Sequence, residues 1–302
     1  MLYAYFKKQI VPLSEAKVSI MTHALHYGTA VFEGIRGNWN EQKKQLYIFR
    51  MEDHYQRMRE GSKLLLMDLG HSTQELCQIT LELVKRSELK EDIYIRPLAY
   101  KSSETLGVRL HNLENNLCIF AIPWGPYFSS DRATCCVSTW RRPDDNVIPA
   151  RAKTSGIYIN NAFAKTDAVS KGFDEAIMLT PDGHVSEGSG ENIFIILNGQ
   201  LITPPIYDNI LAGITRDTII TLAQNELGLE VIERPIDRVE LYMAGECFLS
   251  GTAAHITPIT AIDHREVGDG EIGKVTSKLQ QAYFDVIRGN NPKYSGWCTP
   301  VY

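Results

Sequence analysis

The most informative part of the chain is residues 151–194, RAKTSGIYINNAFAKTDAVSKGFDEAIMLTPDGHVSEGSGENIF. Its periodicity predicts a helix, then a hairpin, then a buried strand, over residues 160–171, 175–187 and 192–197. Asp182-Gly183 lies between two strand-like runs and is a recognised turn signal for such a hairpin. A helix followed by paired strands is typical of an α+β arrangement.

Two charged residues in this stretch, Lys153 and Glu187, are the candidates for the chemistry. Gly188-Ser189-Gly190 follows the carboxylate directly, which indicates backbone held close to a bulky group. Taken alone, each feature also has an ordinary interpretation. The lysine fits a solvated surface ammonium, the glutamate a carboxylate at a rim, and the glycines a β-bulge.

Composition restricts the class of protein. The chain has 302 residues, of which 44% are hydrophobic and 22% charged, as expected for one or two globular domains. A net charge of −5 argues against nucleic acid or an anionic membrane as a partner. No apolar run approaches the roughly 20 residues of a membrane-spanning helix. The first thirteen residues, MLYAYFKKQIVPL, do not read as a signal peptide, so we expect a cytoplasmic location.

The six cysteines form no Cys-x-x-Cys pair. Cys135 and Cys136 are adjacent in a strand-like run, so their side chains should point to opposite faces. We interpret all six as reduced, mostly buried thiols. Neither a His-Glu-x-x-His motif nor a Cys/His cluster is present, and we expect no metal site.

The order of strand-like and helical segments predicts two α+β domains. A proline-, glycine- and aromatic-rich break suggests the boundary, with domains at 1–122 and 133–302 and a connecting loop at 123–132. In the second domain, Thr215 resembles an N-cap for a helix over residues 217–227 that Gly228 ends.

Eight short motifs then occur in a fixed order along nearly the whole chain: HALHYGTAVFEGIR, the arginine of HYQRM, YIRPL, PWGPY, KTSGIYIN, SEGSGENIF, GITRD and SGTAA. In this order the chain resembles the branched-chain amino acid aminotransferases, which are fold-type IV enzymes dependent on pyridoxal 5'-phosphate (PLP). The resemblance implies an α+β, two-domain fold-type IV architecture. It has a smaller N-terminal α+β domain and a larger C-terminal domain with a mixed, barrel-like sheet.

The resemblance also implies roles toward the cofactor. Lys153 would form the Schiff base and then move the α-proton of the substrate. Glu187 would face the ring nitrogen and keep it protonated, so that the ring accepts electrons. Tyr158 would hydrogen-bond the ring hydroxyl, although it also fits a core tyrosine. The phosphate would be held by Arg57, Ile214, Thr215 and Thr252. Of these, Ile214 and Thr215 suit an anion on physical grounds, because they lie at a helix N-terminus. Periodicity alone would make Arg57 a surface residue.

Substrate contacts follow from the same resemblance. Aromatic walls are implied at Phe32, Trp124, Tyr127 and Tyr158. Tyr94 and the amides of Thr252 and Ala253 would bind the α-carboxylate, and Arg96 the distal carboxylate of glutamate. Tyr94 and Arg96 share one face of a strand, which also fits an exposed cross-strand pair. Further positions would reach the neighbouring subunit's pocket and so imply a homodimer or a dimer-based oligomer: Tyr27, Leu106 and Val108.

The implied reaction is transamination of leucine, isoleucine and valine with 2-oxoglutarate, giving branched-chain 2-oxo acids and glutamate, a step of branched-chain amino acid biosynthesis. One position departs from the family pattern, because His255 stands where many relatives have glutamate. This affects the expected substrate range and not the reaction. The Cys-x-x-Cys of mammalian relatives is absent, so thiol regulation of that kind is not expected.

Two related activities share the fold that the resemblance implies, a D-amino acid aminotransferase and a lyase of the aminodeoxychorismate type. Tyr94-x-Arg96, PWGPY and SGTAA together favour the branched-chain enzyme. A non-catalytic binder on the same scaffold would need neither Lys153 nor Glu187. A dinucleotide-binding enzyme is rejected, because the glycines at 188–190 run into a strand and open no helix.

Overall fold

The computed structural model describes all 302 residues, and they divide into two compact units. Unit 1 comprises residues 1–125, 152–156 and 285–302; unit 2 comprises residues 126–151 and 157–284. The chain therefore passes from one unit to the other after residue 125, inside the loop expected at 123–132. The second domain expected from the sequence includes 285–302, but this segment groups with unit 1 because its strand β17 (Cys298–Pro300) pairs with β5 (Gln45–Phe49).

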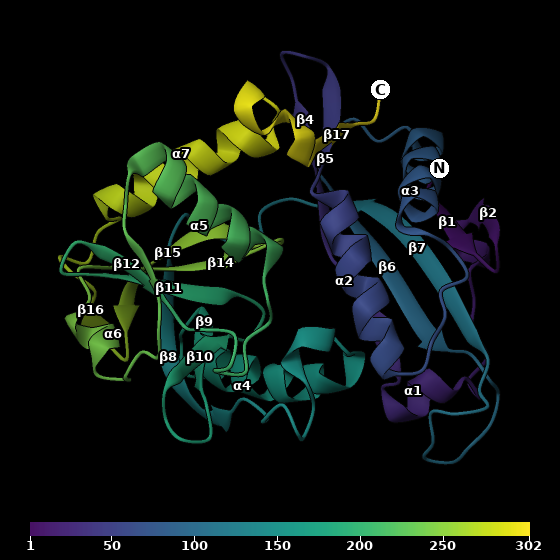
Figure 1. The fold of residues 1–302 in the computed structure, drawn as a ribbon, viewed down its shortest axis with the longest axis horizontal. Coiled ribbons are helices and arrows are strands. Elements are labelled where there is room, and N and C mark those ends of the chain that lie inside the picture. Colours follow the sequence, from purple (N-terminus) through teal and green to yellow (C-terminus); the bar gives the residue numbers. More distant parts are fainter. The chain divides into compact units, whose positions relative to one another are not determined.

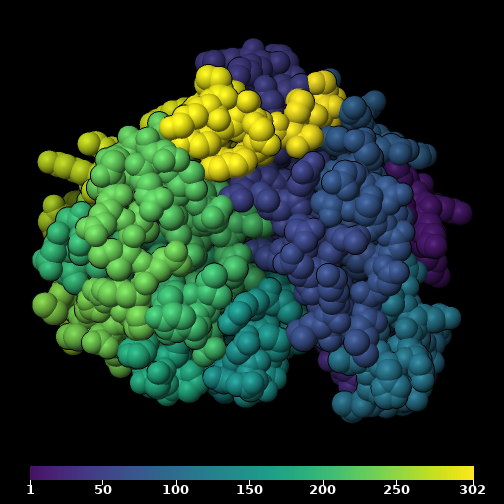
Figure 2. Space-filling view, viewed as in Figure 1, coloured from purple at the N-terminus to yellow at the C-terminus, as the bar shows by residue number.

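Unit 1 is built on an eight-stranded antiparallel sheet with the order β17-β5-β4-β6-β7-β1-β2, in which β3 also pairs with β6. Its remaining strands are β1 (Tyr3–Phe6), β2 (Gln9–Pro12), β3 (Ala30–Phe32), β4 (Ile35–Asn40), β6 (Ile93–Lys101) and β7 (Asn115–Pro123). The helices wholly in this unit are α1 (His23–Tyr27), α2 (Met51–Leu64) and α3 (Thr73–Ser87), with two 3-10 segments, η1 at Leu13–Glu15 and η4 at Pro292–Trp297. Figure 2 shows the C-terminal residues, in yellow, against the purple β4–β5 hairpin.

Alternation along the strands decides which face of this sheet is covered. In β7, Leu117, Ile119 and Ala121 point into the core. α2 and α3 supply the other half of that core (Figure 1). α3 begins with a capping box between Ser72 and Glu75, which satisfies two otherwise unpaired N–H groups.

Unit 2 contains a nine-stranded mixed sheet, curled into a half-barrel (Figure 1), with the order β10-β9-β8-β15-β14-β11-β12-β13 and β16 on β15. Its strands are β8 (Ala133–Arg141), β9 (Glu175–Leu179), β10 (Val185–Gly188), β11 (Asn192–Leu197), β12 (Gln200–Thr203), β13 (Val231–Glu233), β14 (Glu246–Gly251), β15 (His255–Ile262) and β16 (Arg265–Glu266). Its helices are α4 (Tyr158–Ser170), α5 (Ile214–Leu227) and α6 (Glu240–Met243). α7 (Lys274–Ile287) begins in unit 2, and the division falls at its residue 285.

The hairpin predicted from Asp182-Gly183 is confirmed, because β9 and β10 pair antiparallel on either side of this turn. The opposite orientation of the adjacent cysteines in β8 is also confirmed. Cys135 packs among the residues of one apolar cluster, and Cys136 packs with Ala164, Ala168 and Met178 in another, under α4. None of the six cysteines is in a disulfide.

Two predictions concern the ends of α5. The helix α5 starts at Ile214, with Gly213 as its N-cap and no side-chain capping bond, so the prediction that Thr215 is the N-cap is wrong. Thr215 lies in the first turn instead and is buried. The C-terminus of α5 at Gly228 is confirmed, since this glycine has φ of 61° and closes the helix in the left-handed conformation. None of the helices has the length and apolar character needed to span a bilayer.

Candidate active site

Lys153 is held in a strained backbone conformation within unit 1. Its φ is 47°, in the left-handed region that residues with a side chain seldom adopt. The neighbouring strand β3 fixes it, because the N–H of Phe32 donates to the Lys153 carbonyl at 3.3 Å and Val31 pairs with Thr154. Strain of this kind is found where the surrounding structure must present a particular side chain. The side chain is half-buried, and its Nζ lies 5.0 Å from the centre of the Phe32 ring.

Two glycines allow the segment around Lys153 to approach the rest of unit 1 closely. A Cβ at Gly61 of α2 would lie 2.5 Å from the carbonyl oxygen of Ala152. A Cβ at Gly28 would lie 2.8 Å from the Cα of Gly156, and Gly28 itself has φ of 63°. Because both contacts are with backbone, which cannot move aside easily, a side chain at either position would displace Lys153.

A buried carboxylate, Glu33, orders two side chains on α2. Arg57 donates to it twice, from Nε and an Nη at 2.7 Å each, and His54 Nδ1 lies 2.7 Å from the same carboxylate. His54 and Arg57 are three residues apart and therefore lie on one face of the helix. Glu33 is fully buried, while the Arg57 side chain is 13% exposed. The bidentate pair fixes the plane of the guanidinium, as arginine–carboxylate forks do.

The protonation states in this cluster follow from burial and charge. Burial on its own raises the pKa of the Glu33 carboxyl, but the charge of Arg57 and hydrogen bonds from His54 and Arg57 outweigh it and hold the pKa well below its usual range. Burial lowers the pKa of His54, and the charges of Arg57 and Lys153 lower it further against the opposing effect of Glu33. At neutral pH we therefore assign a neutral His54 that donates from Nδ1 to a charged Glu33.

We expect Glu33→Gln to lower the free energy of unfolding by about 3 kcal/mol, since it leaves a mostly buried guanidinium without its counter-charge. Urea unfolding at pH 7 measures this loss. Glu60→Gln, at an exposed position of the same helix, is the matched control and should change stability by less than about 0.5 kcal/mol. Equal stability of Glu33→Gln and the wild type would show that Glu33 does not hold Arg57.

A second polar group lies on β6 and consists of Tyr94 and Arg96. Arg96 donates from an Nη to the Tyr94 hydroxyl at 2.9 Å and stacks over the Phe32 ring with its Cζ 4.5 Å from the ring centre. Gly34 leaves room for this arrangement, because a Cβ there would collide with the Tyr94 hydroxyl at 2.0 Å. The Arg96 Nε is buried and has no hydrogen-bond partner in the protein. Both side chains are half-buried, so they are more than an exposed cross-strand pair.

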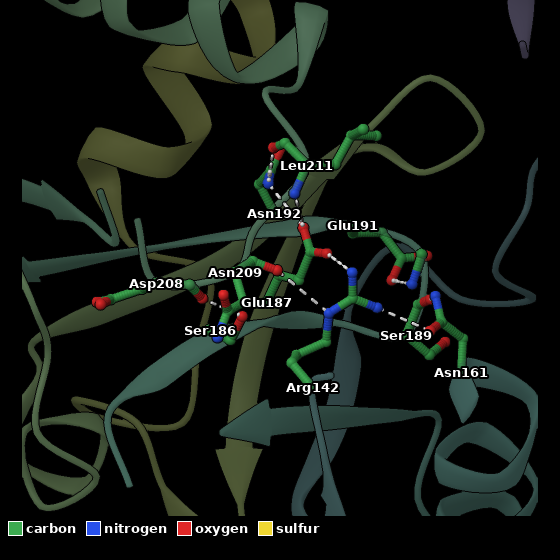
Figure 3. A network of polar contacts seen from close by, with 11 residues as sticks. Arg142, Asn161, Ser186, Glu187, Ser189, Glu191, Asn192, Asp208, Asn209 and Leu211 are labelled. Carbon is green, nitrogen blue, oxygen red and sulfur yellow. Dashed lines mark hydrogen bonds and ion pairs between the residues drawn. The ribbon is translucent and has the colours of Figure 1, made fainter. Parts of the chain in front are cut away.

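In unit 2, Glu187 lies on β10 at the centre of a buried polar network (Figure 3). Its carboxylate is paired with Arg142 at 2.8 Å, and the two side chains are 7% and 2% exposed. It also accepts from the Asn192 amide at 3.0 Å and from the Leu211 N–H at 3.1 Å. A buried carboxylate with a cationic partner and two further donors is stabilised in its charged form.

Arg142 is itself fixed from several sides (Figure 3). One Nη donates to the Asn161 side chain at 2.7 Å, and its Nε donates to the Asn209 carbonyl at 3.4 Å. Asn161 in turn donates to the Ser189 carbonyl at 2.6 Å, which ties α4 to the glycine-rich segment after Glu187. Gly188 is buried in this polar turn, whereas Gly190 is exposed and faces open space.

The N-terminus of α5 adjoins this network through Asn192. A Cβ at Gly213 would lie 2.0 Å from the Asn192 side-chain oxygen. Only glycine therefore lets the helix start so close to Asn192, which hydrogen-bonds Glu187. Ile214 and Thr215 form the first turn of α5, where N–H groups point out of the helix end and the helix dipole favours an anion. Both residues are buried.

Thr252 and Ala253 form the three-residue turn, with Ala254, that joins β14 to β15 and is closed by the pair Gly251–His255. His255 has φ of 56°, and its ring packs against two aromatic rings of α7, with centres 5.8 Å from Tyr283 and 5.3 Å from Phe284. The position that departs from the family pattern is therefore anchored on α7 as well as in the turn.

A second buried carboxyl, Glu191, lies next to this turn. Gly188 and Gly251 both pack on it, since a Cβ at these glycines would lie 2.8 Å from its Oε2 and 3.5 Å from its Cγ. Burial raises the pKa of Glu191 to about 8, and the charges of Glu175 and Glu187 act in the same direction. Glu191 therefore carries a proton at neutral pH.

This proton makes stability depend on pH. Between pH 4.5, the ordinary value for glutamate, and about pH 8, the folded chain keeps a proton that the unfolded chain has lost. The free energy of unfolding should fall as pH rises through this window and level off above it. Glu191→Gln should remove up to about 1.4 kcal/mol of this fall per pH unit. Urea unfolding from pH 5 to pH 9 tests it, with exposed Glu266→Gln as control; identical pH slopes in Glu191→Gln and wild type would contradict it.

The remaining candidates lie in several places. Tyr158 is the first residue of α4 and is half-buried. Trp124 in unit 1 and Tyr127 in unit 2 are 36% and 39% exposed in the loop after β7. The Tyr27 hydroxyl accepts from the Gly107 N–H at 3.0 Å, beside Leu106 and Val108, which are 61% and 90% exposed.

Sequence reasoning did not find the residues that hold the candidates in place, namely Glu33, His54, Arg142, Asn161 and Asn192. A signal existed for the first two. Glu33 is a lone carboxylate in the apolar run AVFEGI, and His54 precedes Arg57 by three residues. For Arg142 no local signal exists, because its side-chain partners come from three different segments of unit 2.

Comparison with known proteins gives a consistent result. The chain matches the family Amino-transferase class IV over residues 30–262. It is 50% identical over 301 residues to a probable branched-chain-amino-acid aminotransferase of Aquifex aeolicus, covering 99% of this chain and 97% of the relative. It superimposes with a TM-score of 0.95 on the branched-chain aminotransferase of Thermoproteus uzoniensis crystallised with norvaline, at 42% identity and over 100% and 99% of the two chains.

A further similar structure is informative about ligands. It is the T.th. branched-chain amino acid aminotransferase complexed with N-(5'-phosphopyridoxyl)-L-glutamate. The TM-score is 0.94 at 40% identity, and the match covers 99% of this chain and 98% of that one.

Proposed function

The chain belongs to the branched-chain amino acid aminotransferases of the class IV family, which use PLP, and we propose that it transfers the amino group of leucine, isoleucine and valine to 2-oxoglutarate. The observation that carries this proposal is the combination of a strained, half-buried lysine with a buried, charged carboxylate, at the motif positions that the family uses for PLP. The similar proteins reported above are named as branched-chain aminotransferases and are 50% and 42% identical to this chain, which favours this activity over a D-amino acid aminotransferase or a lyase.

The chemistry of the residues fits PLP. When bound, PLP supplies an aldehyde that takes up the amino group and a pyridinium ring that accepts electrons from the α-carbon. Glu187 suits the ring nitrogen, because Arg142, Asn192 and the Leu211 N–H stabilise its negative charge away from water. Tyr158 would donate to or accept from the ring hydroxyl. The phosphate dianion requires cations and N–H donors, and from their motif positions we assign Arg57, the first turn of α5 and the hydroxyl of Thr252 to this role.

Lys153 has two tasks in this proposal. Its Nζ would hold the aldehyde carbon of the cofactor while no substrate is bound. With substrate bound, its Nζ would be free to take the proton from the substrate α-carbon in one half of the reaction and to give one back to the α-carbon in the other half. The backbone strain and the contacts with β3 fix the starting point of this side chain.

Substrate recognition requires one pocket to accept either an apolar side chain or a carboxylate. We assign Tyr94 and the amides of Thr252 and Ala253 to the α-carboxylate, and Arg96 to the distal carboxylate of glutamate. The unpartnered Nε of Arg96 supports this, because a buried guanidinium nitrogen without a partner is costly unless a ligand or water satisfies it. Phe32, Trp124, Tyr127 and Tyr158 would supply the apolar walls.

We further propose a homodimer or an assembly of dimers. Exposed apolar side chains gather where α1 adjoins the segment 104–108, and they include Ile20 at 84%, Leu25 at 62% and Val108 at 90% exposure. Apolar groups this exposed on adjoining segments are typical of a surface that a partner covers. Tyr27, Leu106 and Val108 would then reach the pocket of the second copy. Sedimentation of the purified chain measures the assembly. A cytoplasmic location stays a prediction from the sequence.

A panel of amino donors tests the function. Purified chain loaded with PLP is offered L-leucine, L-isoleucine, L-valine, D-alanine and L-alanine in turn, with 2-oxoglutarate as acceptor, and glutamate formation is measured. We expect the three branched-chain donors to give the highest kcat/KM. Transfer from D-alanine but not from L-leucine would overturn the proposal.

A further inference from the structure

The side chain of Lys165, on α4, contacts two aromatic rings of the loop between β7 and β8. Its Nζ lies 5.6 Å from the ring centre of Tyr127 and 5.2 Å from that of Phe128. The two rings meet edge to face, with centres 4.9 Å apart. All three residues belong to unit 2. The function proposed above does not use this lysine.

The ammonium of Lys165 is held on its other side by acceptors of the sheet. It is 2.7 Å from the carboxylate of Glu175 on β9 and donates to the Asp174 carbonyl at 2.6 Å. Glu175 is fully buried, and a buried carboxylate without a cation is very costly. The position of the Lys165 Nζ is therefore fixed by Glu175 and not by the loop.

A fixed cation is a suitable anchor for aromatic rings. A ring face attracts an ammonium within about 6 Å, by roughly 0.5–1 kcal/mol when exposed and more when shielded from water. The segment 124–132 forms no helix or strand, so ring contacts of this kind have a large share in setting where its side chains lie. Tyr127 is 39% exposed, which leaves part of its ring available to another molecule.

We propose that Lys165 is a positioning residue for the substrate: paired with Glu175, it holds Tyr127 and Phe128 in the orientation in which Tyr127 contacts the side chain of the amino acid. This rests on the proposed function, in which Tyr127 is an apolar wall. Because the contact is with the substrate side chain and not with the reacting atoms, its loss should affect KM for the amino donor and leave kcat nearly unchanged. Cofactor content should not change.

The test requires a variant that removes the ammonium without stranding a buried charge. Lys165→Met alone leaves Glu175 unpaired and is expected to be unstable. The double variant Lys165→Met/Glu175→Gln removes both charges at similar volume. We expect it to raise KM for L-leucine by about three- to tenfold, with kcat within about twofold of wild type. Lys165→Arg keeps a cation over the rings, so its KM for L-leucine should stay close to the wild-type value. Lys171→Met, at an exposed lysine at the end of the same helix, is the control and should leave KM unchanged.

A second measurement does not depend on activity. Chymotrypsin cleaves after Tyr127 or Phe128 only when the loop leaves its anchored position, so initial cleavage there should be about three- to tenfold faster in the double variant than in the wild type or Lys165→Arg. Unchanged cleavage and unchanged KM in the double variant would overturn the proposal. Faster cleavage with unchanged KM would also overturn it, because the lysine would then order the loop without positioning substrate. Failure of the wild type to use leucine would instead refute the proposed function, while cleavage would still report on the loop.

Discussion

Replacing Lys153 with alanine is expected to reduce transamination of leucine by at least about 10⁴-fold. The variant loses the amine that moves the α-proton, and positioned general bases alone contribute about 10²–10⁴-fold. The variant also loses the covalent attachment to the cofactor. In the wild type this attachment would let the substrate amine replace the lysine amine directly. Single-turnover kinetics of PLP-loaded protein with leucine measures the effect. The yellow colour of the wild type should shift or disappear in the variant, which is a readout independent of turnover.

Folding can be separated from chemistry in this experiment. Alanine at 153 keeps the same left-handed backbone, so the free energy of unfolding should change by less than about 1 kcal/mol. Lys90→Ala, at an exposed lysine, controls for loss of a positive charge. A small primary amine added to the solution should restore part of the proton transfer in Lys153→Ala, because it supplies the missing base at a lower effective concentration. More than about 1% residual activity without added amine would assign the proton to another residue.

The sequence carried strong information about local structure here. The Asp182-Gly183 turn was sufficient to predict a hairpin, because the turn depends on neighbouring residues. The α5 start was predicted less well. A threonine near a helix start usually signals a cap, but here Gly213 is the N-cap, since only a residue without a side chain fits against Asn192.

The sequence motifs pointed to the candidate residues themselves, but not to the residues that hold them in place. Lys153 and Glu187 stand in strings that are recognisable one residue after another. Arg142 approaches Glu187 only because β8 and β10 flank β9 in the sheet, and no spacing along the chain encodes this order. The same holds for Glu33 and Arg57, which are 24 residues apart and meet because α2 packs beside β3.

The division of the chain was the least predictable feature. The loop after β7 looks like a simple boundary, with all later residues in a second domain. However, β17 adds a strand to the sheet of unit 1, and residues 152–156 pair with β3 and pack on Gly28, at the end of α1, and on Gly61 of α2. Such returns depend on long-range pairing, which leaves little trace in composition or local periodicity.

Glu187→Gln is expected to lower kcat by about 10²–10³-fold, the scale seen when one electrostatic partner of a transition state is removed. Glutamine keeps the shape of the side chain and can still accept from Asn192 and the Leu211 N–H. It cannot keep the ring nitrogen protonated, so the ring should accept electrons from the α-carbon less readily. The visible spectrum of the PLP-loaded variant, titrated from pH 6 to pH 9, reports the protonation of the cofactor directly.

The same substitution leaves Arg142 as a buried guanidinium without its counter-charge, which should cost about 3–5 kcal/mol of stability. The double variant Arg142→Met/Glu187→Gln removes both charges and should recover most of that stability, since two neutral side chains of similar volume replace a buried ion pair. It should not recover kcat. Stability returning without activity would assign the catalytic effect to the carboxylate itself. If the double variant regained wild-type kcat, the loss in Glu187→Gln would come from the unpaired arginine, and Glu187 would serve only to neutralise it.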